Sequence, residues 1–236
     1  KVIVDEEELI TESNEDNNQE TESITVSYPP ILLLDDDNSG NNGGSRTETD
    51  QYYANALDNL TNPIAYDIIR VNSSADAPGI DILSEYQMII WVCGTDYQSG
   101  DTDVTFTDND KTNVAEYLEG GGAMWVIGMD ILYDFDTSDG DRSSGDFEYD
   151  YLGVSYADND RATPAVVYGV DDDPISDGIE YNADAISSDF ADDVNPRSGF
   201  EKVLSSNGDY NISTIRTEDE FKLVFMTIDF SSITSS

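Results

Sequence analysis

The chain has no histidine and only one cysteine among its 236 residues, and its lysines and arginines together number only 10. Without histidine it cannot build a Ser-His-Asp or Cys-His catalytic group, or bind zinc through imidazole nitrogens. Cys93 has no partner for an intrachain disulfide, and its place between an apolar run and a glycine predicts a small buried thiol. No apolar run approaches the roughly 20 residues of a membrane-spanning helix, so no membrane span is expected.

Acidic residues, by contrast, are in large excess. The 51 aspartates and glutamates set a formal net charge of −41. A surface this negative repels nucleic-acid phosphates and anionic lipids and attracts cations, so we expect no nucleic-acid partner. Because 38% of the residues are apolar and 10% are aromatic, the chain can still bury a core, and we expect a folded acidic body.

Residues 1–30 form a first segment with a composition of its own. Most of residues 5–8 and 12–22 are acidic or polar, so this part cannot form a core. Two short apolar islands flank these residues, and each could form a short strand: Val2, Ile3 and Val4, then Ile24 and Val26. The segment is predicted to be either a solvated acidic tail or an assembly extension whose strand joins the sheet of a neighbouring chain.

Residues 31–236 have the pattern of an α/β domain. Apolar runs alternate with amphipathic stretches that predict helices over 49–60 and from about 107 to 119, and the runs lie at 31–34, 66–71, 88–92 and 123–127. Short connections between strand, helix and strand predict right-handed crossovers and a mostly parallel sheet flanked by helices. After residue 133 the pattern weakens, with short strands expected near 154–156, 165–170 and 200–204 and a last core strand at 221–228.

The order of several motifs supports a family resemblance. The motifs are ILLLDDD at 31–37, YQMIIW at 86–91, LEGGG at 118–122, VIGMD at 126–130, YLG at 151–153 and DPISDG at 173–178. Together they resemble the glutamine-amidotransferase-like, flavodoxin-like domains of large secreted bacterial and archaeal proteins. The resemblance implies that fold for 31–236 and a secreted or cell-surface location. Catalytic members carry a cysteine on a tight elbow after a strand; here Met129 takes that place, so amidotransferase activity is not implied.

Carboxylates follow several predicted strands at the point where each strand ends. In a parallel sheet these ends share one edge, where ligands gather. The candidates for a Ca²⁺ site there are Asp35, Asp36, Asp37, Asp96, Asp130, Asp134 and Asp136. The competing interpretation is that they are ordinary solvated aspartates. Residues 134–140 resemble a calcium loop but have their glycine one position late, so only weak calcium binding is expected from them.

Three N-x-S/T sequons are candidates for glycosylation, at Asn59, Asn72 and Asn211. The chain begins at Lys1 rather than at methionine, which leads us to expect either that a leader was removed or that the sequence was trimmed. Both features favour a secreted or cell-surface protein.

Three functions fit these observations. The first is a noncatalytic extracellular structural subunit of a filament, sheath or surface layer, self-assembling through its extension and through cations that bridge acidic faces. The second is a secreted carboxylate-dependent hydrolase or carbohydrate-binding module, with Asp36 and Asp130 as the acids. Trp91 and Trp125 could support a sugar, but their apolar surroundings predict core positions. The third is a domain of a longer secreted protease-like polypeptide.

Overall fold

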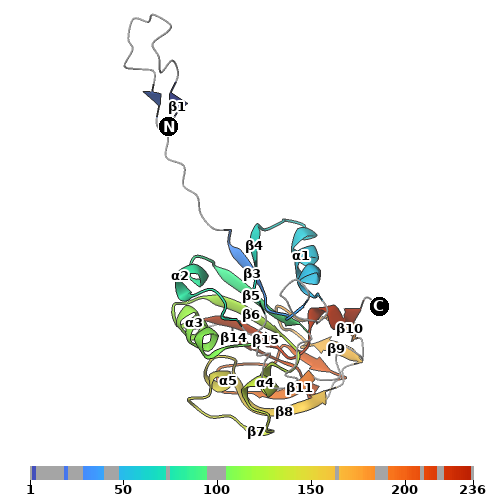
Figure 1. The fold of residues 1–236 in the computed structure, drawn as a ribbon. Coiled ribbons are helices and arrows are strands. Elements are labelled where there is room, and N and C mark those ends of the chain that lie inside the picture. Colours follow the sequence, from blue (N-terminus) through green and yellow to red (C-terminus); the bar gives the residue numbers. More distant parts are fainter. Residues whose placement is uncertain are drawn as a thin grey trace, which may run out of the picture.

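A computed structural model gives the fold of the chain (Figure 1). It describes residues 2–3, 19–20, 29–39, 48–72, 75–94, 105–162, 165–183, 191–207, 210–216 and 221–234. In this part of the chain, no helix is long and apolar enough to cross a membrane.

A six-stranded sheet forms the centre of the domain. Its strands are β3 (Ile31–Asp35), β4 (Tyr66–Arg70), β5 (Met88–Gly94), β6 (Ala123–Gly128), β14 (Ser213–Arg216) and β15 (Lys222–Met226). The strand order is β14-β15-β6-β5-β3-β4, and only β14 pairs antiparallel. The five parallel strands follow one another in the flavodoxin-like order 2-1-3-4-5. This confirms the predicted mostly parallel α/β sheet.

Five α-helices join these strands in the described part of the chain. They are α1 (Asp50–Asp58), α2 (Ile80–Leu83), α3 (Asp108–Glu119), α4 (Ile131–Phe135) and α5 (Phe147–Asp150). The predicted start of α3 is confirmed: Asp110 N–H donates to Thr107 Oγ1 at 3.2 Å, and Thr107 N–H donates to the Asp110 carboxylate at 2.9 Å. Helix α1 also forms where predicted, but its N-cap Thr49 makes no side-chain cap.

The second half of the chain is richer in strands than its pattern predicted. A five-stranded antiparallel sheet has the order β13-β12-β9-β10-β16, and a three-stranded one has the order β11-β8-β7. The elements are β7 (Gly140–Asp141), β8 (Val154–Ala162), β9 (Val166–Gly169), β10 (Glu180–Ala183), β11 (Ala191–Pro196), β12 (Leu204–Ser206), β13 (Tyr210–Asn211), the 3-10 helix η3 (Phe230–Ser232) and β16 (Ile233–Thr234). The strand expected at 200–204 begins only at Leu204, because Phe200 closes a turn by donating to Arg197 O at 3.0 Å.

Each face of the central sheet has its own hydrophobic core. On one face Leu32, Leu34 and Trp91 pack with the helices α2 to α5 and with β8 and β11. On the other, Leu33 and Ile90 pack with α1 and the five-stranded sheet. Figure 1 shows α2 and α3 on the side of the sheet opposite to α1. Helices therefore flank only part of the sheet, and strands complete both outer layers.

The described part of the amino-terminal segment is a pair of short strands. Strand β1 (Val2–Ile3) pairs antiparallel with β2 (Gln19–Glu20), with Val2 opposite Glu20. The predicted strand at Val2 and Ile3 therefore has a partner in its own chain. Val4, Ile24 and Val26, also predicted to take part in assembly, lie outside the described residues.

Candidate functional site

The carboxyl ends of the parallel strands form the edge at which a fold of this kind binds ligands. The strand order reverses between β3 and β5, so the crevice is expected beside the residues that end these two strands. Strand β3 ends at Asp35 and continues into Asp36 and Asp37, and Asp229 follows the end of β15. An acidic edge is thus present, as predicted, and all four of these aspartates are buried.

Asp35 and Asp36 are held by partners from different elements. The guanidinium of Arg70 lies 3.3 Å from Asp35 Oδ2 and also 2.6 Å from Asp50 Oδ2, at the start of α1. Asp36 Oδ2 accepts a hydrogen bond of 3.0 Å from the indole N–H of Trp91. Trp91 is itself fully buried and stacked on Phe106, which confirms its predicted core position. These two carboxylates therefore bind protein donors.

Asp37 ties the end of β3 to the start of α1. Its Oδ2 accepts hydrogen bonds from the Thr49 N–H at 2.7 Å and the Thr49 hydroxyl at 3.0 Å, and its Oδ1 accepts from the Ser39 N–H at 3.0 Å. The Thr49 hydroxyl is thus directed to Asp37, which explains why it does not cap α1. Because Asp37 is fully buried, this carboxylate stabilises the fold through its own hydrogen bonds.

Two glycines allow the strand ends to approach each other closely. A Cβ at Gly94, whose φ is +64°, would lie 2.7 Å from Asp37 Cβ and 2.9 Å from Thr49 Oγ1. A Cβ at Gly128 would lie 2.6 Å from Cys93 Cβ. The thiol of Cys93 is buried at this contact, as predicted. In the described part of this edge, the space between β3, β5 and β6 is filled by the protein itself.

Asp229 and Tyr53 form a buried acidic pair at the same edge. The Tyr53 hydroxyl donates to Asp229 Oδ2 at 2.9 Å and accepts from the Phe230 N–H at 3.0 Å. Burial raises the pKa of Asp229, and the negative charge of Asp37 adds to that rise. Burial, followed by the charge of Asp229, likewise raises the pKa of Tyr53 well above its usual value.

The raised pKa of Asp229 sets the sign of a pH effect. Because the folded pKa lies above the usual 3.8, the destabilisation caused by ionised Asp229 is complete above the folded pKa and is relieved as the pH falls toward 3.8. We expect Asp229→Asn to gain less stability than the wild type between about pH 7 and about pH 5. Urea unfolding at both pH values measures this. The exposed Asp171→Asn, with the same charge change, is the control; equal gains in both variants would contradict the assignment.

The elbow after β6 differs from its prediction. Asp130, not Met129, has the left-handed conformation of the strand-to-helix turn, with a φ of 57°. The four described non-glycine residues with positive φ are all asparagine or aspartate, which tolerate this region, so φ alone does not indicate strain. Met129 and Asp130 are only 3% exposed, and Asp36 is 7% exposed. Asp36 and Asp130, the predicted hydrolase pair, are therefore both buried.

The described part of the chain contains no group of three or more acidic or cysteine side chains placed to hold a metal ion. Asp96 lies outside the described residues. Asp134 accepts hydrogen bonds from the N–H and hydroxyl of Thr105, at 3.0 and 2.9 Å. Of the seven aspartates predicted to share one calcium site, Asp35, Asp36, Asp37, Asp134 and Asp136 each contact different protein donors.

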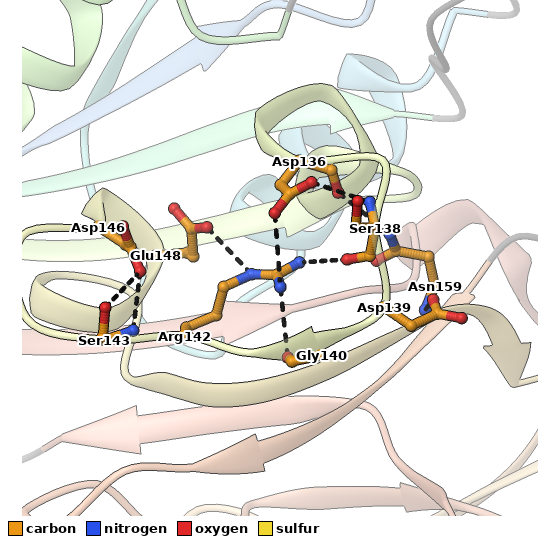
Figure 2. A network of polar contacts seen from close by, with 9 residues as sticks. All are labelled: Asp136, Ser138, Asp139, Gly140, Arg142, Ser143, Asp146, Glu148 and Asn159. Atoms are coloured by element: carbon orange, nitrogen blue, oxygen red, sulfur yellow. Dashed lines mark hydrogen bonds and ion pairs between the residues drawn. The ribbon is translucent and has the colours of Figure 1, made fainter.

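An arginine, Arg142, follows directly after residues 134–140, the stretch that resembled a calcium loop, and its guanidinium pairs with acidic side chains around it (Figure 2). The side chain of Arg142 is only 4% exposed; its Nε lies 3.1 Å from Glu148 Oε1 and its Nη1 3.7 Å from Asp136 Oδ2. The same guanidinium donates to the carbonyl oxygens of Gly140 at 3.2 Å and Ser138 at 3.0 Å. The Ser138 N–H and, to a smaller extent, Arg142 lower the pKa of Asp136.

Sequence reasoning missed Arg142, although a signal was present. It is the only basic residue between Lys111 and Arg161, within a strongly acidic stretch. A lone arginine among many carboxylates, in a loop long enough to fold around it, indicates an internal ion pair. Here the guanidinium pairs with Asp136, one of the carboxylates predicted to bind calcium, and with Glu148.

The three sequons differ in accessibility. Asn59 and Asn72 are exposed. Asn211 is half-buried, and its side-chain N–H donates to Val194 O at 2.6 Å, while Ser213 of the same sequon is fully buried. In the folded chain, the amide of Asn211 is therefore already engaged, and a glycan there does not fit this conformation.

No family model and no curated protein matches the chain. Among solved structures, a β-galactosidase from Bacillus circulans sp. alkalophilus is 13% identical with a TM-score of 0.53, over 88% of this chain and 29% of that one. A cytoplasmic protein from Salmonella typhimurium LT2 is 12% identical with a TM-score of 0.52, over 84% and 87%. A ThuA-like protein from Bacteroides uniformis is 11% identical with a TM-score of 0.46, over 89% of this chain and 86% of that one.

The chain spans less than a third of the length of the glycosidases that it matches: 31% of an exo-β-1,4-mannosidase from an Opitutaceae bacterium and 29% of two β-galactosidases. At these identities the likenesses concern the fold alone. They agree with the strand order in identifying a flavodoxin-like α/β domain.

Proposed function

We propose that this chain is a noncatalytic structural domain of an extracellular assembly, such as a filament, sheath or surface layer. One observation carries the proposal: at the ligand-binding edge of this fold, four carboxylates are buried and hydrogen-bonded or ion-paired within the protein, those of Asp35, Asp36, Asp37 and Asp229. Catalysis needs groups that can reach a substrate. The Asp37 carboxylate, for example, accepts hydrogen bonds from Thr49 and Ser39, so it stabilises the fold.

A surface suited to contact with another protein supports the same proposal. Strand β4 lies at the edge of the central sheet among the described strands. Around it, large hydrophobic side chains from α1, the following connection and β4 itself are exposed, by 36% to 50%: Tyr52, Leu60, Ile64 and Ile68. An exposed sheet edge with apolar side chains beside it favours pairing with another chain. The amino-terminal segment of a second copy is the proposed partner.

In this proposal, calcium ions bind between neighbouring copies of the chain rather than within one copy. A net charge of −41 makes acidic surfaces repel one another unless cations lie between them. The acidic loop around Arg142 contains its own cation, so it does not require a metal to fold. Divalent cations are therefore proposed to bridge exposed carboxylates of neighbouring copies.

Light scattering tests assembly directly. We expect the whole chain to form large species in calcium, and we expect these to disappear when residues 1–30 are deleted and to shrink when calcium is chelated. Ile68→Ser should weaken assembly through β4, whereas Ile175→Ser, at another exposed isoleucine, should not. Thermal unfolding checks that each variant stays folded. A monodisperse monomer of the whole chain in both buffers would falsify the proposal.

A second candidate function is a carboxylate-dependent hydrolase or carbohydrate-binding module. The observation in its favour is that Asp130 occupies the left-handed position of the strand-to-helix elbow, where other folds place a nucleophile. The test is turnover of a panel of nitrophenyl glycosides by the wild type and by Asp130→Asn. Loss of turnover at unchanged melting temperature supports this function. No turnover by the wild type, or a variant that is only less stable, rejects the hydrolase.

A further inference from the structure

A hydrophobic cleft lies between the central sheet and the five-stranded sheet. Its volume is about 370 Å³, in the range of small-molecule sites. Among the described residues, its lining contains no charged side chain, and Ser176 is its one hydroxyl-bearing aliphatic residue. In a chain of net charge −41, such a lining marks a site that differs from the rest of the surface.

The floor of the cleft comes from the central sheet. Met88, Trp125 and Val224 line it and are only half-buried, although each belongs to a strand of the core. Trp125, predicted to lie in the core, packs against it but is only partly buried, because the five-stranded sheet leaves this part of the sheet face partly uncovered. At the rim, Ile175 is 54% exposed and Tyr181 is 43% exposed. The cleft thus holds apolar surface that folding has not removed from water.

The opposite wall is held in place by a tight turn. Asp173 Oδ1 accepts hydrogen bonds from the N–H groups of Ile175 and Ser176, at 2.9 and 2.8 Å, and from the Ser176 hydroxyl at 2.9 Å. The Ser176 hydroxyl oxygen in turn accepts from the Val170 N–H at 3.0 Å. A Cβ at Gly169 would lie 1.7 Å from Ser176 O, so backbone packs directly on backbone here. The wall that carries Ile175 is therefore pre-formed.

One polar group of the lining has a weak partner. The indole N–H of Trp125 donates to the thioether sulfur of Met226 at 3.2 Å, and both residues line the cleft. No polar atom of the lining is exposed to the cleft, so this N–H is directed to the sulfur and the cleft offers a bound molecule only apolar surface. Ser176, in contrast, is fully engaged by Asp173 and Val170.

We propose that this cleft binds a neutral, mainly apolar small molecule, which covers the exposed apolar surface of Met88, Trp125 and Val224. An anionic head group is disfavoured because the protein is strongly negative and the described lining has no cation. A cationic head group is disfavoured because that lining has no carboxylate to pair with it. At about 30 Å³ per water-sized unit, the volume accommodates about a dozen such units, the size of a medium-length alkyl alcohol or ester.

The experiment compares three probes with the same alkyl chain: n-decanol, decanoate and decylammonium. Titration of the full chain is followed by calorimetry and by the fluorescence of Trp125, while fully buried Trp91 serves as the internal reference. We expect saturable binding of n-decanol, at least about ten-fold tighter than that of either charged probe. Failure of n-decanol to saturate, or equal binding of all three probes, overturns the proposal.

Three variants locate the binding site. Val224→Phe places a ring in the cleft and should weaken n-decanol binding at least about ten-fold. Trp125→Phe keeps an aromatic wall but removes part of the apolar surface of the floor, so the affinity should fall about five-fold. Ile64→Phe adds a ring at an exposed position outside the cleft and should change nothing. If Val224→Phe does not fold, the n-decanol affinity of Trp125→Phe alone tests the site. An n-decanol affinity that is unchanged in every folded variant of the cleft refutes the site.

Discussion

Replacing Arg142 with methionine should lower the free energy of unfolding by about 3–5 kcal/mol, because it leaves the buried Glu148 carboxylate without its cation. The guanidinium also donates to two backbone carbonyls, of Gly140 and Ser138, and methionine can replace neither hydrogen bond. Asp136 loses its ion pair as well, although its exposed side chain is partly solvated. Urea unfolding measures the difference.

Two further variants separate the buried ion pair from the change in net charge. Lys202→Met removes the same charge from an exposed position and should alter stability by less than about 0.5 kcal/mol. Adding Glu148→Leu to Arg142→Met removes the unpaired carboxylate and should recover part of the loss. If Lys202→Met is as destabilising as Arg142→Met, net charge rather than the buried pair is responsible.

The same variant should become more responsive to calcium. Without the guanidinium, Asp136 and Glu148 resemble an empty cation site, and Ca²⁺ can partly replace the missing charge. Millimolar Ca²⁺ should therefore raise the melting temperature of Arg142→Met more than that of Lys202→Met, in which only general screening acts. An equal rise in both variants would show that the loop has no specific affinity for the ion.

Gly94→Ala is expected to destabilise the domain by about 2–6 kcal/mol, the sum of a left-handed conformation at alanine and a forced separation of the strand ends. The new Cβ would lie 2.7 Å from Asp37 Cβ, and Asp37 cannot retreat without breaking its hydrogen bonds to Thr49. Chemical denaturation gives the magnitude.

Gly178→Ala is the matched control for this change. Gly178 has a φ of +75°, close to the +64° of Gly94, but nothing lies within 4 Å of the position that a Cβ would take there. Gly178→Ala should therefore lower the free energy of unfolding only by the cost of the left-handed conformation at alanine, about 1–3 kcal/mol. Equal effects of the two substitutions would mean that the edge between β3 and β5 can open, which would make it available to a ligand and favour the hydrolase or carbohydrate-binding alternative.

Much of the fold follows from local patterns in the sequence. A parallel strand buried on both faces must be continuously apolar, so Ile31–Asp35 and Met88–Gly94 lie where their apolar runs predicted. The start of α3 depends on Thr107 and Asp110, which are close in sequence and form a capping box. The strands after residue 133 were harder to predict, because short antiparallel strands form long-range pairs that leave little local pattern.

The roles of the acidic residues needed the tertiary structure. Neighbouring aspartates at 35–37 look alike in the sequence, yet they accept from Arg70, Trp91 and Thr49 respectively, 35, 55 and 12 positions away. Whether a carboxylate binds a metal or a protein donor depends on which donors the fold brings within about 3 Å. Composition could predict a negative edge, but not that its described carboxylates point to internal partners.

By itself, the sequence determined the α/β class, the parallel core, the lack of histidine chemistry and the strong negative charge, because each depends on composition or on neighbours along the chain. Only the tertiary structure decided that Arg142 pairs with Asp136 and Glu148 and that Gly94 packs against Asp37. It also decided that Trp125 borders an apolar cleft. These three features join residues from separate elements, and the distances between such residues exist only after the chain has folded.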